Sequence, residues 1–177
     1  GSGLGRHAIY FARKGFEVSA VDISGYGISH LLSWAEAENL PVKAVTGDML
    51  HLPYPDNCFD CIFAYHVISH SDTQGVETII SEIERVLKRD GEIFLSFCSK
   101  ESTDYLEKGA EKIDGNTVVC RKEPEAGVAH FYADTADIIR LLHNFTITKI
   151  RHTEYCPLDL QTKQIDKYYY VNAVFSP

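Results

Sequence analysis

Apolar residues recur along the chain with two periods, which predict strands alternating with helices. Helical spacing predicts amphipathic helices over about 4–14, 26–39, 73–88 and 135–142. Short apolar runs predict strands over 18–22, 42–45, 60–65, 92–97, 145–152 and 167–175. This alternation is typical of an α/β fold with a doubly wound, mostly parallel sheet.

The last two predicted strands, 145–152 and 167–175, are joined by a short linker that contains Pro157 and has no helical period. Strands joined in this way are expected to be antiparallel neighbours, so the sheet should end in an antiparallel C-terminal hairpin. The pattern is weaker over 100–133, where it predicts a short helix, two short strands and a polar loop, at 103–110, 117–120, 129–132 and 122–127.

Three glycines alternate at the start of the first predicted helix, at Gly1, Gly3 and Gly5, and Asp22 ends the strand that follows it. Glycines let the backbone pass close to a ligand, and the N–H groups of a helix start point toward it. A carboxylate at the position of Asp22 can accept both hydroxyl protons of a ribose. The spacing predicts a site for an adenosine-type ligand, although a glycine-rich helix start in an ordinary α/β protein remains an alternative.

A glycine loop of this type follows the central strand of a doubly wound sheet, and no strand precedes Gly1 in the sequence. Without that strand, ladder groups on both sides would be left unpaired. We therefore expect the first strand to be missing, residues 1–177 to be one N-terminally incomplete domain, and an acidic residue to stand two places before Gly1.

The length and composition support a single domain with one hydrophobic core, and they argue against nucleic-acid and membrane partners. The chain has 177 residues, 45% of them hydrophobic, and a net charge of -8. Its acidity argues against duplex nucleic acid and favours a small or weakly charged substrate. No signal peptide or apolar run of membrane length is seen, which predicts a soluble protein without a membrane partner. The sequence leaves open whether the protein forms a homodimer.

The cysteines are odd in number and scattered, which indicates reduced thiols and a cytoplasmic protein. They are Cys58, Cys61, Cys98, Cys120 and Cys156. Cys61 and Cys98 fall in predicted strands, where a thiol behaves as a small apolar group. The spacing Cys58-x-x-Cys61 is known from zinc and redox sites, but no second pair accompanies it.

Two histidines follow the predicted strand 60–65, at His66 and His70. On a helix they would share one face and offer a pair of metal ligands, but the sequence shows no third ligand at a suitable distance, so no metal site is predicted. His70 is a candidate general base or an organiser of its loop.

The motifs resemble those of the class I S-adenosylmethionine-dependent methyltransferases of the small-molecule type. The opening G-x-G-x-G run is similar to their first motif, whereas a dinucleotide site would have glycine in place of Arg6. The segment LPYPDNCFDCIF resembles their LP-(F/Y)-x-D-x-(S/C)-F-D-x-(I/V) pattern. The segment ERVLKRDG resembles their E-x-x-R-V-L-K-P-G-G pattern, with Arg89-Asp90 in place of Pro-Gly.

The resemblance implies a Rossmann-like fold, S-adenosylmethionine as cofactor with S-adenosylhomocysteine as product, and methyl transfer to a small acceptor. It implies that a residue such as Asp48 hydrogen-bonds adenine, that Met49 lies against the ring, and that residues 100–133 form a substrate lid. The cofactor residues it implies are Gly1, Ser2, Gly3, Gly5, Arg6, Asp22, Ile23, Gly47, Asp48, Met49, Tyr65 and His66.

The acceptor side is less defined. His70 and His130 are the candidate catalytic bases, and Tyr65 is a candidate to stabilise the cationic methyl donor through its ring face. Tyr105, His130, Phe131 and Tyr132 are candidates to line the lid, although aromatic residues in a short strand are commonly core. Asp48 has an alternative role as an ordinary turn residue. Two other functions stay open, namely an NAD(P)-dependent oxidoreductase and a non-catalytic cofactor-binding domain.

Overall fold

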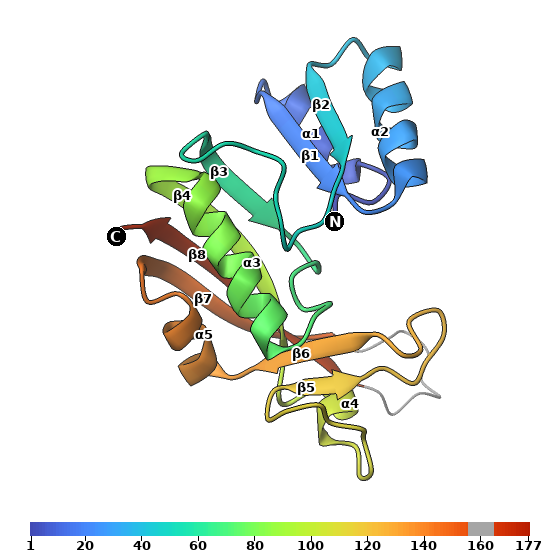
Figure 1. Ribbon diagram of the computed structural model, residues 1–177, viewed down its shortest axis with the longest axis vertical. Helices are drawn as coiled ribbons and strands as arrows, with labels where there is room; N and C mark the ends of the chain where they lie inside the picture. The colour runs from blue at the N-terminus through green and yellow to red at the C-terminus, as the bar shows by residue number, and fades with distance from the viewer. Residues whose placement is uncertain (156–164) are drawn as a thin grey trace. The chain divides into compact units, whose positions relative to one another are not determined.

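The computed structural model describes residues 1–155 and 165–177, and its contacts divide the chain into two compact units, 1–53 and 54–177 (Figure 1). Each unit is treated by itself. The linker residue Pro157 and the fifth cysteine, Cys156, lie outside the described residues.

The first unit is a small parallel α/β layer. Strands β1 and β2 pair in parallel from Val18 opposite Val42 to Asp22 opposite Thr46. Ile9 and Leu31 are fully buried and, with Ala35, form the core between the helices and this pair of strands. Its elements are α1 (Arg6–Arg13), β1 (Val18–Asp22), α2 (Gly25–Ala37) and β2 (Val42–Thr46).

The second unit is a mixed sheet with helices packed against it. Its long elements are β3 (Phe59–Ala64), α3 (Thr73–Val86), β4 (Leu87–Ser99), α5 (Thr135–Leu141), β7 (Phe145–Tyr155) and β8 (Asp166–Phe175). Three short elements lie between β4 and α5, namely α4 (Thr103–Leu106), β5 (Thr117–Val119) and β6 (Ala129–Ala133).

Strand β4 is the centre of this sheet because it is paired along both edges. One edge pairs in parallel with β3 and, at its carboxyl end, with β6. The other edge pairs antiparallel with β8, and β8 pairs antiparallel with β7. The predicted antiparallel C-terminal hairpin is thus confirmed.

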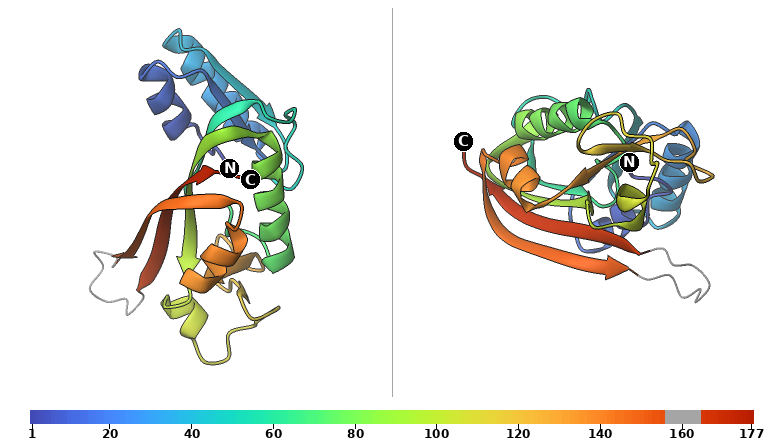
Figure 2. Two further views of the ribbon diagram at one scale, coloured as in Figure 1. Left: turned by 90° about the vertical axis from the view of Figure 1, so that its left-hand side faces the viewer. Right: turned by 90° about the horizontal axis from the view of Figure 1, so that it is seen from below.

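Helices α3 and α5 cover the same face of the curled sheet (Figure 2). The apolar stripe of α3 is buried as its spacing predicts, at Val76, Ile79, Ile80, Ile83 and Val86. Asp134 caps α5 by accepting the Asp137 N–H at 3.0 Å. The longest helix, α3, has 14 residues, and within the described ranges no helix has the length and apolar character needed to cross a bilayer.

Several predicted boundaries are wrong for local reasons. Helix α1 begins two residues later than predicted, because Gly5 has a φ of 94°, which a right-handed helix does not allow. The sequence predicts a turn at Arg89-Asp90-Gly91 between the helix 73–88 and the strand 92–97. Strand β4 instead starts directly after α3 and has a bulge there, with Asp90 at a φ of 62°. The helix predicted over 103–110 is a single turn, α4.

Two predicted core positions are exposed. Cys61 lies on β3, which pairs only with β4 among the described strands, and its side chain is exposed to solvent. The helical spacing also predicts one buried face of α2 formed by Ile28, Leu31, Leu32 and Ala35. Three of these are buried, but Leu32 is 40% exposed.

A substitution at Phe97 can test whether β4 lies in the core of the second unit. Its side chain is fully buried, so Phe97→Ala should lower the free energy of unfolding by about 3–5 kcal/mol through lost burial and a cavity. Ile139→Ala is the matched control, because Ile139 is 57% exposed and should change stability by about 0.5 kcal/mol or less. Urea unfolding measures both, and equal losses would contradict the assignment of Phe97 to the core.

Candidate functional site

The carboxylate of Asp22 ties the opening glycine loop to the end of β1. Oδ2 accepts the Gly3 N–H at 2.7 Å, and Oδ1 accepts the Ser24 N–H at 2.8 Å. The residue is only 8% exposed. Burial alone would raise the pKa of Asp22, but the backbone N–H groups of Ser24 and Gly3, together with the nearby amino group of Gly1, outweigh it and lower the pKa, so the side chain is charged.

Glycine is required in this loop by close packing. Gly5 has a positive φ, and a Cβ there would lie 2.4 Å from Leu31 Cδ1. A Cβ on Gly27 would lie 2.7 Å from the Gly3 carbonyl oxygen, so α2 also needs a glycine where the loop crosses it. Ser2 adds a buried Oγ that has no hydrogen-bond partner in the described part of the chain. A tight backbone turn with an unpaired hydroxyl fits a loop that receives a polar ligand.

The end of β2 joins the same edge of the first unit. The Gly47 N–H donates to the Asp22 carbonyl at 2.9 Å. The exposed Asp48 accepts the Leu50 N–H at 2.9 Å, which is the turn role that the sequence left as an alternative. Ile23 is 78% exposed beside Asp22, Arg6 is exposed and Met49 is half-buried. The glycine loop, Asp22 and the corner at Gly47 therefore meet at one edge of the first unit.

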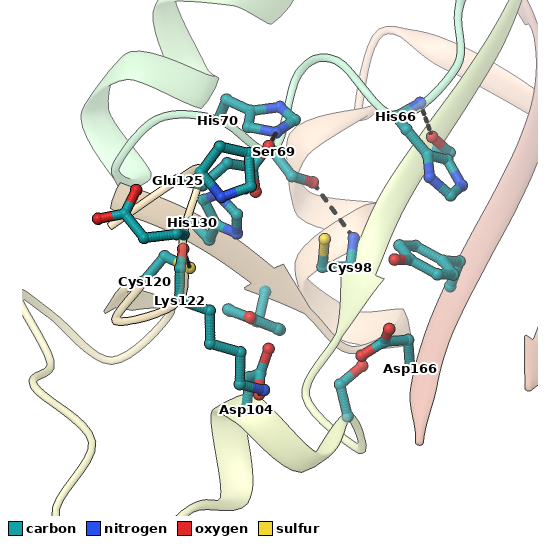
Figure 3. Close-up of a pocket in the computed structure, with 16 residues that line it drawn as sticks. His66, Ser69, His70, Cys98, Asp104, Cys120, Lys122, Glu125, His130 and Asp166 are labelled. Carbon is teal, nitrogen blue, oxygen red and sulfur yellow. Dashed lines mark hydrogen bonds and ion pairs between the residues drawn. The ribbon is translucent and has the colours of Figure 1, made fainter. Parts of the chain in front are cut away.

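The second unit contains a cavity of about 350 Å³ (Figure 3). Its wall is formed by the loop after β3, the carboxyl end of β4, the loop between β5 and β6, and the start of β8. The lining residues are His66, Ser69, His70, Ser96, Cys98, Ser102, Asp104, Cys120, Lys122, Glu123, Pro124, Glu125, His130, Tyr132, Asp166 and Tyr168.

The loop that carries both predicted histidines is fastened to the sheet by two serines. The His66 N–H donates to Ser96 Oγ at 2.6 Å. The buried Ser69 bridges two strands, since its Oγ accepts the Cys98 N–H at 3.2 Å and its carbonyl accepts the Phe131 N–H at 2.8 Å. This loop is not helical, so His66 and His70 do not share a helical face and do not form the pair that was considered from sequence.

His66 and His70 have different surroundings. The ring of His66 stacks between Tyr65, at a centroid distance of 4.2 Å, and Tyr168, at 4.1 Å. Its Nε2 lies 3.2 Å from the Tyr170 hydroxyl. His66 is therefore part of an aromatic cluster, whereas His70 projects from the other end of the loop toward β6 (Figure 3).

His70, Glu125 and His130 converge on the cavity wall. His70 Nε2 lies 3.2 Å from Glu125 Oε1, and His130 Nε2 lies 3.3 Å from Glu125 Oε2. The two imidazole centroids are 4.8 Å apart. The sequence singled out both histidines but not Glu125, because a lone glutamate in a polar loop carries no signal of its partners.

Burial controls the ionisation of several groups in the wall. It lowers the pKa of His130, as does nearby His70, although Glu125 opposes both effects. Burial raises the pKa of the Cys98 thiol to about 12, so this cysteine is an uncharged packing group and not a nucleophile. Burial likewise raises the pKa of Tyr168.

The candidate lid aromatics divide between cavity and core. His130 and Tyr132 line the cavity as predicted. Phe131 is fully buried in the core, because successive strand residues face opposite sides of β6. The Tyr105 hydroxyl donates to the Gly115 carbonyl at 2.7 Å, and Tyr105 is not among the lining residues.

The α/β layers and the glycine loop followed by a carboxylate are features of the Rossmann-like folds. Residues 1–95 match the family model of the methyltransferase domain. The chain therefore belongs to the methyltransferase domain family.

The chain is similar to known methyltransferases both in sequence and in fold. The chain is 35% identical over 94 residues to a sterol 24-C-methyltransferase of Gibberella zeae, which covers 51% of this chain and 24% of that protein. It thus spans about a quarter of that relative. An S-adenosylmethionine-dependent methyltransferase of Methanosarcina mazei has the same fold, with a TM-score of 0.79 at 20% identity, over 99% of this chain and 90% of that one.

A second solved structure with this fold was determined with ligands. It is the 1,6-didemethyltoxoflavin N1-methyltransferase of Burkholderia thailandensis, with its substrate and S-adenosylhomocysteine bound. Its TM-score is 0.70 at 18% identity, over 100% of this chain and 69% of that one.

Alanine substitutions at two glycines with similar backbone conformations can distinguish the cost of close packing from the cost of backbone strain. Gly5 and Gly15 have φ values of 94° and 89°, but only Gly5 has a neighbour, Leu31, in the space of a Cβ. Gly15→Ala should lower the free energy of unfolding by about 1–2 kcal/mol through the left-handed backbone. Gly5→Ala should cost about 1–3 kcal/mol more through overpacking. Chemical unfolding measures the difference, and equal losses would contradict the close packing of the loop.

Asp22 predicts a pH-dependent stability. Because its folded pKa is lowered, its stabilisation is fully present above the unfolded carboxyl pKa of about 3.9 and is lost as the pH falls through the folded value. Asp22→Asn should therefore cost about 1–3 kcal/mol at pH 7 and progressively less in acid. Asp48→Asn is the control, because Asp48 is exposed and accepts one N–H. Urea unfolding between pH 7 and pH 3 tests this, and a constant loss for Asp22→Asn would contradict it.

Proposed function

We propose that this protein transfers a methyl group from S-adenosylmethionine to a small-molecule acceptor. The observation that carries the proposal is the charged Asp22, which fastens a G-x-G-x-G loop in a chain whose first 95 residues match a methyltransferase domain. The ligands of the toxoflavin methyltransferase, which has the same fold, support this cofactor. S-adenosylmethionine supplies an electrophilic methyl group on a sulfonium, which an acceptor nucleophile displaces in line.

Residues of the first unit are proposed to hold the adenosine and methionine parts of the cofactor. The carboxylate of Asp22 has lone pairs beyond the two that accept Gly3 and Ser24, and these can accept ribose hydroxyls. The exposed apolar surface of Ile23 beside it suits the face of a purine ring. The other cofactor residues proposed from this unit are Gly1, Ser2, Gly3, Gly5, Arg6, Gly47, Asp48 and Met49. Tyr65 and His66, which belong to the second unit, are proposed as cofactor residues from the family resemblance alone.

The acceptor is proposed to bind in the cavity of the second unit. Asp104, Glu123, Glu125 and Asp166 line it with carboxylates, against one lysine, Lys122, so an anionic acceptor is disfavoured. His70 and His130 stand on its wall as the proposed catalytic residues. Residues 100–133 supply much of this wall, which supports their proposed role as the substrate lid.

The chemical demand on the protein is modest because the sulfonium is intrinsically reactive. Aligning the acceptor with the methyl group can supply about 7–11 kcal/mol of the barrier by proximity. The fastening of the His66–His70 loop by Ser69 and Ser96 holds that part of the wall in place, and such rigidity is what alignment requires.

Calorimetry on the purified protein tests the cofactor. S-adenosylmethionine should bind, and Asp22→Asn should weaken binding by about 1–3 kcal/mol because it removes a charged acceptor. Glu38→Gln is the control, because Glu38 pairs with Arg13 at the far end of α2 and should leave binding unchanged. Binding of NAD in place of S-adenosylmethionine would refute the proposal. Binding without methyl transfer to a broad acceptor panel would indicate a non-catalytic domain.

A further inference from the structure

We propose that His70, Glu125 and His130 bind a divalent transition-metal ion, with zinc as the best match, on the wall of the cavity. The three side chains come from different segments, namely the loop after β3, the loop between β5 and β6, and β6 itself (Figure 3). Two imidazoles and one carboxylate are a donor set that zinc uses in catalytic sites.

The distances suit a shared ion. Zinc–ligand bonds of about 2.0–2.2 Å place neighbouring ligand atoms of a tetrahedral site about 3.3 Å apart. Each histidine Nε2 already lies at such a distance from a Glu125 oxygen, 3.2 Å for His70 and 3.3 Å for His130. The ligand atoms, one from each residue, all lie within 4.8 Å of one another, so small movements of the side chains would bring them around one ion.

The hydrogen bonds of His70 orient its ring for metal binding. Its Nδ1 lies 3.0 Å from the Val67 carbonyl, which can only accept, so Nδ1 carries a hydrogen. The lone pair of the neutral ring is then on Nε2 and faces a carboxylate oxygen. The Nε2 lone pair of His70 and the Glu125 oxygen would repel each other at this distance unless a cation lies between them. That cation is either a proton on Nε2 or a metal ion. Metal-bound histidines usually donate their other ring N–H to such a carbonyl.

His130 provides an independent observation that favours the metal. Its side chain is 14% exposed, and its Nε2 atom is buried without a hydrogen-bond partner in residues 1–155 and 165–177. The contact of 3.3 Å with Glu125 lies outside hydrogen-bonding geometry, so the ring nitrogen does not point at the oxygen. A metal ion bound in the direction of the Nε2 lone pair would give this buried nitrogen a partner. The Glu125 oxygen would then be a second ligand of the same ion, beside the nitrogen and not in line with its lone pair.

Three protein ligands leave a coordination position for water or for a ligand in the cavity. Zinc sites of this kind bind oxygen atoms and lower the pKa of a bound water or hydroxyl. If the proposed function holds, this position is where a hydroxyl or carbonyl oxygen of the acceptor would be held. The metal site itself does not depend on the methyl-transfer proposal.

Titration of the chelator-treated protein with Co²⁺, followed by visible absorption, tests the site. One equivalent of Co²⁺ should give intense d–d bands typical of four-coordinate cobalt, and Zn²⁺ should abolish them. His70→Ala and Glu125→Gln should each weaken binding at least tenfold. Both side chains are substantially exposed, 37% and 46%, so the variants should fold, which circular dichroism verifies.

Two controls exclude other ligands. His143→Ala removes an exposed histidine near the end of α5 and should leave the Co²⁺ spectrum unchanged. The Cys58→Ser/Cys61→Ser variant removes the C-x-x-C pair and should also bind Co²⁺ normally. The proposal is overturned if His70→Ala and Glu125→Gln bind as well as the unmodified protein, or if the cysteine variant loses the spectrum.

Measuring S-adenosylmethionine binding on the same samples separates this proposal from the proposed function. A cobalt spectrum without cofactor binding would refute the function and leave the metal site standing. Cofactor binding without a cobalt spectrum would refute the metal site alone.

Discussion

The buried carboxylate of Asp22 is the contact on which the ligand-binding edge of the first unit depends. A loop built on glycines has little conformational preference of its own, so something must hold its backbone in one arrangement. The Gly3 and Ser24 N–H groups converge on one charged side chain, and the Asp22 carbonyl accepts the Gly47 N–H. Three chain segments thus share a single residue. The carboxylate stays charged despite its burial because the Gly3 and Ser24 N–H groups and the Gly1 amino group surround it.

In the second unit, Ser69 has a comparable role through different chemistry. A neutral hydroxyl and a backbone carbonyl join the loop after β3 to β4 and β6, where the two strands have only a short parallel pairing, Cys98 with Tyr132 and Ser99 with Ala133. The loop is therefore hydrogen-bonded to both strands next to this short pairing. The cavity lies beside these paired residues, so its position follows from the pairing of the strands.

The sequence predicted the periodic elements well because burial on one face leaves a readable pattern. The helix α3 and the strands β1, β2, β7 and β8 lie where the apolar spacing placed them. It failed where a backbone feature has no side-chain signature, as at the bulge around Asp90. The candidate site was predicted in the same uneven way. Asp22 and Gly47 could be singled out from the sequence because each follows a predicted strand, whereas Glu125 meets two histidines only through the folding of a polar loop.

The match to the methyltransferase domain covers only part of the residues that line the cavity. The match ends at residue 95, inside β4, whereas Glu125 and His130 lie beyond it. The first unit and the loop carrying His70 belong to the matched part, so two of the three proposed metal ligands come from the remainder. Such a metal site would combine His70, which lies within the methyltransferase domain match, with Glu125 and His130, which lie beyond its end. Its presence would therefore depend on residues 100–133 together with His70 of the matched part.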